Sequence, residues 1–138
     1  MCSPHTHLLG CNKISEYLPA HVKAVKEAGL CVIWCCDPCH GNTEVVDGVK
    51  TRRFDNMLKE VILAFKIHDE CGSRLGGVHL ELTGDDVTEC VGGADNISDL
   101  SNNYETYCDP RLNYTQSLDM AFAITRELDK YYPSTFRM

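Results

Sequence analysis

The sequence predicts an α/β fold built on a parallel sheet, and three observations carry that prediction. Segments with helical and strand-like periodicity alternate along the 138 residues, which is the pattern of βα crossover units. Residues 30–34 form a continuous apolar run, as in a strand covered on both faces. Glycines follow the expected helices as stop signals. We therefore expect residues 1–138 to form one unit with the order helix, strand, helix, strand, helix.

The amino-terminal third supplies the first helix and the first clear strand. Apolar residues recur at helical spacing between residues 13 and 28, and Gly29 follows as a stop signal. Pro19 is the weak point of this helix. The apolar strand 30–34 comes next, and residues 7–9 are a candidate for one further strand.

A second helix and a second strand follow. Apolar residues from Phe54 to His68 mark one face of a helix that ends near Gly72. Residues 78–82 then alternate between apolar and polar types, which is the period of a strand.

The last third of the chain predicts a long loop and a third helix. Residues 84–113 have no sustained periodicity, and a loop of this length in a domain usually serves function. Asn113 is the expected N-cap of the third helix, with Gln116 placed as in a capping box, and the helix runs to Tyr132.

Composition and charge disfavour several classes of protein. The net charge of −7 opposes binding to nucleic acid and to anionic membranes. No apolar run approaches the ~20 residues of a membrane span, and the first residues do not resemble a secretory signal. We expect a soluble intracellular protein whose nine cysteines are mostly reduced thiols.

Three residues with metal-ligand side chains are expected at one edge of the sheet. His40 follows the apolar strand, Glu81 lies near the end of the next strand, and Asp109 precedes the third helix. Functional groups of α/β folds gather at the carboxyl ends of strands. One imidazole and two carboxylates suit Mn²⁺, Co²⁺, Zn²⁺ or Fe²⁺. The alternative is structural: a histidine that caps a turn, a glutamate paired with Lys or Arg, and an aspartate in a turn.

Three further patterns each have an alternative. Residues 50–53 read Lys-Thr-Arg-Arg at the expected start of the second helix, which favours a phosphate site or else a solvated helix end. Cys36 and Cys108 both lie beside the expected metal site and are a candidate disulfide pair, with packed free thiols as the alternative. Residues 36–40 match a haem-attachment pattern, but they end a buried strand, so we expect no haem there.

Five long motifs follow one another along the chain. They are residues 34–43 (WCCDPCHGNT), 50–55 (KTRRFD), 76–84 (GGVHLELTG), 87–93 (VTECVGG) and 108–113 (CDPRLN). Together they resemble the carboxyl-terminal part of the class II 3-deoxy-7-phosphoheptulonate (DAHP) synthases, the plant and microbial type. The resemblance spans about residues 12 to 130.

This resemblance implies a fold and a reaction. The fold is α/β, as the last two to three βα units of a (β/α)₈ TIM barrel, in a carboxyl-terminal fragment that covers residues 1–138. The reaction is the condensation of phosphoenolpyruvate with erythrose 4-phosphate and water, which releases phosphate and opens the shikimate route to chorismate and aromatic amino acids. A homo-oligomer is implied for the full-length family, and the location would be the cytoplasm, or the plastid in a plant-like eukaryote.

The resemblance also implies roles for particular residues. It places His40, Glu81 and Asp109 on three of the four family ligands of a divalent metal, with Mn²⁺ or Co²⁺ expected first and Zn²⁺ or Fe²⁺ next. Lys50 matches a lysine at the catalytic substrate site. Arg52 is a candidate for the sugar phosphate, and His40 is also expected to contact phosphoenolpyruvate during catalysis.

The chain departs from the family pattern in three respects. The fourth metal ligand, a cysteine, and most of the phosphate-binding cations of the family belong to upstream parts of the barrel. Where the family has Arg-Met-Gly this chain reads Leu-Leu-Gly at residues 8–10, and Cys39 replaces the usual methionine. We therefore expect this chain alone to be inactive. The alternative is a non-catalytic truncated chain that acts as a divalent-metal-binding or regulatory module.

Overall fold

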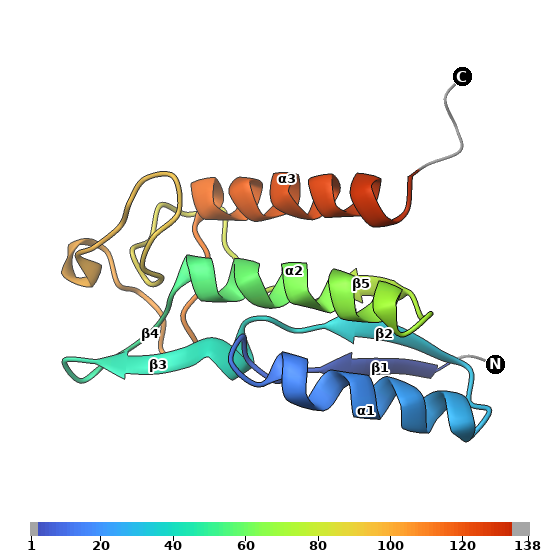
Figure 1. The fold of residues 1–138 in the computed structure, drawn as a ribbon. Coiled ribbons are helices and arrows are strands. Elements are labelled where there is room, and N and C mark those ends of the chain that lie inside the picture. Colours follow the sequence, from blue (N-terminus) through green and yellow to red (C-terminus); the bar gives the residue numbers. More distant parts are fainter. Residues whose placement is uncertain (1–2, 134–138) are drawn as a thin grey trace.

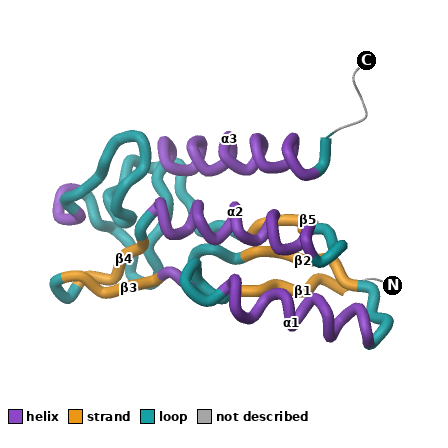
Figure 2. The backbone as a smooth tube through the Cα atoms, viewed as in Figure 1, coloured by secondary structure: helices purple, strands orange, loops and turns teal. Residues whose placement is uncertain are grey.

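The fold is a mixed α/β arrangement in which helices lie over one face of a three-stranded sheet (Figures 1 and 2). The computed structural model describes residues 3–133. Its elements are β1 (Ser3–His7), α1 (Ile14–Glu27), β2 (Val32–Cys36), the 3₁₀ turn η1 (His40–Asn42), β3 (Thr43–Val46), β4 (Val49–Arg52), α2 (Phe54–Glu70), β5 (Leu75–Val78), the 3₁₀ turn η2 (Leu100–Asn102) and α3 (Tyr114–Tyr131). The sheet is parallel with the order β1-β2-β5, and β3 and β4 form a separate antiparallel pair. The predicted α/β class with a parallel sheet is confirmed, and residues 3–133 form no closed barrel.

The first two helices end at the predicted glycines. Gly29 has a φ of 65°, a left-handed conformation that glycine adopts without steric cost. The Leu30 N–H then donates to the Val25 carbonyl at 3.2 Å, which makes the end of α1 a Schellman motif. Gly72 ends α2 in the same way, with a φ of 59°.

All three strands of the sheet are displaced from their predicted positions. Instead of residues 30–34, β2 begins at Val32, because Leu30 belongs to the helix cap. Instead of residues 7–9, β1 covers the five residues that pair with β2. The prediction of a strand at 78–82 is wrong, because β5 lies earlier in the chain and its pairing with β2 ends at Val78.

A hairpin that the sequence analysis did not predict precedes α2. Strands β3 and β4 are joined by Asp47 and Gly48, which have φ values of 50° and 80°. Positive φ at both positions is typical of a type I′ turn, and Asp-Gly is a strong signal for it. The hairpin places Lys50 and Arg52 on a strand.

The long loop predicted between residues 84 and 113 is confirmed, with only the short turn η2 inside it. Its centre is Glu89, a fully buried carboxylate that accepts three hydrogen bonds from Arg111 at 2.7–3.0 Å. Burial alone would raise the pKa of Glu89, but the hydrogen bonds from Arg111 outweigh it and lower the pKa. The predicted capping box of Asn113 and Gln116 is present at the start of α3.

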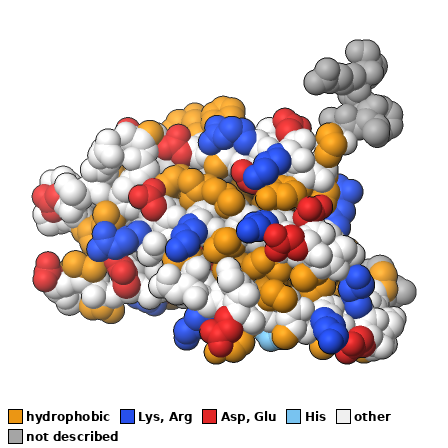
Figure 3. Space-filling view, in the orientation of Figure 1, with side chains coloured by type: hydrophobic (Ala, Val, Ile, Leu, Met, Phe, Trp, Pro, Cys, Tyr) orange, Lys and Arg blue, Asp and Glu red, His pale blue; other side chains and the backbone are white. Residues whose placement is uncertain are grey.

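The hydrophobic core lies between the helices and the sheet. Apolar side chains from every helix and from β2 and β5 are buried in it, including Leu18, Trp34, Met57, Phe65 and Met120. On the helical face of the molecule, basic and acidic side chains are interspersed among hydrophobic ones (Figure 3). No helix within residues 3–133 combines the length and the apolar character needed to cross a membrane.

Candidate metal centre

Three side chains from distant parts of the sequence meet beyond the carboxyl ends of the strands. His40 lies in η1 after β2, Glu81 lies three residues after β5, and Asp109 lies in the loop before α3. His40 Nε2 is 3.3 Å from Glu81 Oε1 and 3.7 Å from Asp109 Oδ2. The candidate ligand atoms all lie within 4.8 Å of one another, so the structure brings together the three residues expected at one edge of the sheet.

The loop that carries His40 is fixed by two glycines in contact. A Cβ built on Gly41 would lie 2.3 Å from the Gly10 nitrogen, and one built on Gly10 would lie 2.4 Å from the Gly41 carbonyl oxygen. Neither position can hold a side chain without moving the backbone. Asn42 ties the same loop to the core, since its amide donates to the Pro38 carbonyl at 2.8 Å and to Glu60 at 2.6 Å.

Asp37 orients the His40 ring. His40 Nδ1 lies 2.7 Å from Asp37 Oδ2, a contact that favours a ring proton on Nδ1, and His40 Nε2 faces Glu81 and Asp109. Burial alone would raise the pKa of Asp37, but hydrogen bonds from the His40 backbone, the His40 ring and His79 lower it. A carboxylate behind a histidine is the usual support of a metal-binding imidazole. The sequence analysis missed Asp37 and also His79, whose Nδ1 lies 3.1 Å from Asp37 Oδ2.

Two cationic side chains from β4 bind the two carboxylates on their other oxygens. Arg52 pairs with Glu81 Oε2 and also donates to the Pro110 carbonyl, while Lys50 pairs with Asp109 Oδ1. The Lys50 ammonium holds the pKa of Asp109 below its ordinary value, and the pKa of Lys50 is raised in return. Each carboxylate therefore keeps one oxygen for His40 Nε2 and uses the other for a cation.

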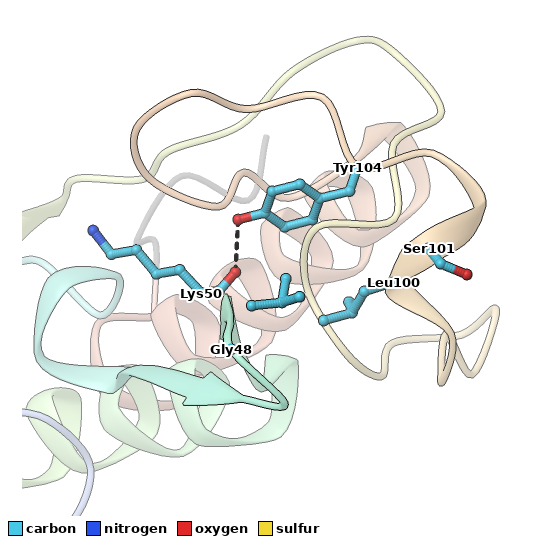
Figure 4. Close-up of a pocket in the computed structure, with 6 residues that line it drawn as sticks. Gly48, Lys50, Leu100, Ser101 and Tyr104 are labelled. Atoms are coloured by element: carbon cyan, nitrogen blue, oxygen red, sulfur yellow. Dashed lines mark hydrogen bonds between the residues drawn. The ribbon is translucent and has the colours of Figure 1, made fainter.

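Residues 50–53, the predicted phosphate-binding segment, lie only partly at the start of the second helix, where Arg53 is the N-cap of α2. Lys50 and Arg52 lie on β4, and Arg53 pairs with Glu44 at 2.8 Å. Arg52 is only 1% exposed, whereas Lys50 is 45% exposed. The Lys50 backbone also borders an apolar hollow of about 340 Å³, where Tyr104 donates to its carbonyl oxygen at 2.7 Å, and the Lys50 side chain extends away from that hollow (Figure 4).

The spacing of the three ligand atoms fits a divalent cation. Two nitrogen or oxygen ligands about 2.1 Å from one ion at a tetrahedral angle lie roughly 3.4 Å apart. The distances from His40 Nε2 to the two carboxylates are 3.3 and 3.7 Å. A lone pair facing two carboxylate oxygens at this distance is unfavourable unless a cation or a proton lies between them.

The candidate disulfide between Cys36 and Cys108 is wrong. Both are free thiols, and Cys36 lies fully buried in the hydrophobic core while Cys108 is exposed in the loop before α3. The cysteines of the described chain are mostly free, as predicted. Those with free thiols are Cys11, Cys35, Cys36, Cys39, Cys71, Cys90 and Cys108.

Known proteins are similar to this chain over most of its length. The profile of the Class-II DAHP synthetase family matches residues 6–125. A phospho-2-dehydro-3-deoxyheptonate aldolase of Streptomyces coelicolor is 55% identical over 119 residues, which are 84% of this chain and 26% of that protein. One of Mycolicibacterium smegmatis is 50% identical over 87% of this chain and 26% of its own length. One of Streptomyces lividans is 52% identical over 84% of this chain and 81% of its own length.

The family profile covers the whole site described above, from the strand before His40 to the start of α3. The chain spans about a quarter of the length of the Streptomyces coelicolor and Mycolicibacterium smegmatis relatives. At these identities over more than four fifths of its residues, this chain belongs to the class-II DAHP synthetase family.

Proposed function

We propose that residues 1–138 form one unit that supplies the last two to three βα units of a (β/α)₈ barrel. Each strand of the sheet is followed along the chain by a helix, in the pairs β1-α1, β2-α2 and β5-α3. The order of the strands in the sheet follows the sequence, as it does around a barrel. Family membership supports the same origin.

The proposed activity is that of a DAHP synthase, which joins phosphoenolpyruvate to erythrose 4-phosphate with uptake of water and release of phosphate. The observation that supports it is the convergence of His40, Glu81 and Asp109. These residues would hold Mn²⁺ or Co²⁺, with Zn²⁺ or Fe²⁺ as further candidates. A bound divalent ion supplies Lewis-acid polarisation of the erythrose 4-phosphate aldehyde.

The protein side chains position the reactants in this proposal. Asp37 keeps the ring proton on His40 Nδ1, which leaves Nε2 free as a ligand. Lys50 is the more exposed cation beside the site, so we assign it the first contact with a substrate phosphate. Arg52 is buried and pairs with Glu81. Its contact with the sugar phosphate therefore requires movement of the residues around the site. His40 faces the same space and would also contact phosphoenolpyruvate.

A chimeric enzyme tests the activity. Residues 6–125 of this chain replace the matching region of the Streptomyces coelicolor relative, which supplies the remaining barrel. The chimera is expected to release phosphate from phosphoenolpyruvate only when erythrose 4-phosphate and a divalent metal are present. Glu81→Gln in the chimera should lower this rate roughly 10³-fold, because metal catalysis is worth several kcal/mol.

Glu70→Gln is the control for Glu81→Gln. It changes an exposed carboxylate on α2 whose ion-pair partner within residues 3–133 is Lys66, and it should leave phosphate release unchanged. A folded chimera that binds Mn²⁺ but releases no phosphate would contradict the proposed activity. The chain alone is expected to bind Mn²⁺ without phosphate release, because most of the family cations that hold phosphoenolpyruvate belong to other parts of the barrel.

Asp37→Asn should weaken metal binding without unfolding the chain. Asparagine carries no charge and offers one acceptor oxygen in place of two. It cannot accept both the Cys39 and His40 backbone N–H groups and the His40 ring as Asp37 does, so His40 loses its fixed orientation. Loss of such a supporting carboxylate costs about 10–100-fold in metal affinity. Calorimetric titration with Mn²⁺ measures the change, with Asp99→Asn, an exposed residue of the 84–113 loop, as the control.

A further inference from the structure

A second group of metal-ligand side chains lies buried between α2 and the strands β1 and β2. His7 ends β1, Cys36 is its neighbour in register on β2, and Glu60 projects from α2. One ligand atom from each lies within 4.8 Å of the others. Their exposures are 4%, 0% and 0%.

His7 gives this cluster an observation that points to a ligand. Among residues 3–133, neither ring nitrogen of this buried side chain has a hydrogen-bond partner. Buried polar groups without partners are rare in folded proteins because they lose their hydration without compensation. Burial and the neighbouring His68 lower the pKa of His7 to about 4, so the ring is neutral at pH 7 and carries a lone pair.

We propose that His7, Cys36 and Glu60 bind one divalent ion of the Zn²⁺ class. An imidazole nitrogen, a thiolate and a carboxylate oxygen form a mixed donor set that suits Zn²⁺, or Co²⁺ as its substitute. This site does not depend on the proposed activity, and it shares no residue with His40, Glu81 and Asp109.

The charges and the lone pairs of the cluster are compatible with the ion. Cys36 releases its thiol proton to the solvent when the ion binds, so a dication meets one thiolate and one carboxylate, and the buried site is neutral. Glu60 Oε1 already accepts the Leu9 and Gly10 N–H groups, at 3.2 and 3.0 Å. Glu60 Oε2 accepts from Asn42 and from no other residue within 3–133, which leaves it a lone pair for the ion.

Cobalt titration of the full chain tests the proposal, because a thiolate bound to Co²⁺ gives a near-ultraviolet charge-transfer band that nitrogen and oxygen ligands do not. The wild-type chain is expected to show this band, and to bind one more Co²⁺ ion than Cys36→Ser, which should lose it. His7→Gln should also lose the band, while Glu81→Gln should keep it. Cys39→Ser and Cys108→Ser are the matched controls, since their sulfurs lie beside the other site, and they should keep the band as well.

Two results would overturn the proposal. The first is a wild-type chain that shows no charge-transfer band at saturating Co²⁺, a measurement that needs no variant to fold. The second is a band that survives in Cys36→Ser and disappears in Cys39→Ser or Cys108→Ser, which assigns the thiolate to the site of Asp109. Neither result bears on phosphate release by the chimera, so the two proposals fail separately.

Discussion

Arg52→Met is expected to lower the free energy of unfolding by about 3 kcal/mol, as loss of one partner from a buried ion pair does. The guanidinium is 1% exposed and pairs with Glu81, donates to the Pro110 carbonyl, and donates to Thr43 Oγ1 at 3.0 Å. Methionine fills a similar volume but donates no hydrogen bond. The Glu81 carboxylate, which is 26% exposed, and the carbonyl of the buried Pro110 then lose their partner.

The neighbouring arginine provides the control. Arg53 is half exposed and pairs with Glu44 at the surface, so Arg53→Met should change the free energy of unfolding by no more than about 1 kcal/mol. Urea unfolding followed by circular dichroism compares both variants with the wild type. Equal stabilities of the two variants would show that Arg52 does not link the hairpin to the site.

Local signals explain why part of the fold could be predicted from sequence. Gly29 and Gly72 end helices because the left-handed conformation is required there, and Asn113 begins α3 through contacts within one turn. These features depend on residues a few positions apart. The Asp47-Gly48 turn has the same local character, and its dipeptide was a sufficient signal for the hairpin that was missed.

Long-range contacts explain what could not be predicted. The bounds of β5 are set by its pairing with β2, which stops at Val78. The alternation of apolar and polar residues continues to residue 82 and does not reveal where the pairing stops. Convergence of the ligand residues was predictable in outline, because segments after parallel strands meet at one edge. Pairing of Glu81 with a Lys or Arg was the alternative that the sequence offered, but the choice of Arg52 as the partner depends on side-chain positions that no spacing reveals, as does the support of His40 by Asp37.

Acid is expected to destabilise the folded protein progressively between pH 6.5 and pH 4, because two buried histidines resist protonation. Burial lowers the pKa of both His7 and His68 to about 4, against an ordinary value of 6.5. Above pH 6.5 both rings are neutral in the folded and the unfolded chain. As the pH falls below 6.5 the unfolded chain binds protons first, so stability is lost until the folded rings protonate near pH 4.

The size of the effect follows from that window. Each histidine contributes a loss of up to about 3 kcal/mol by pH 4, in a domain whose total stability is typically about 5–15 kcal/mol. Besides Cys36 and Glu60, which lie beside the ring, the groups that influence the pKa of His7 are His68, His5, His21 and Asp37, and of these four only Asp37 favours its protonation. Burial raises the pKa of Glu60. Its protonation at low pH therefore acts in the opposite direction and offsets part of the loss of stability.

Urea unfolding at intervals from pH 7 to pH 4 measures this loss, with a chelator present so that no metal binds His7. His68→Leu should make the dependence on pH shallower, because one of the two titrating rings is removed from the core. His21→Gln alters an exposed histidine on α1 and should leave the dependence close to that of the wild type. A wild-type stability that stays level across this range would mean that both rings reach water or a hydrogen-bond partner in solution. In that case the unpaired nitrogens of His7 would not provide a reason for a metal to bind beside Cys36.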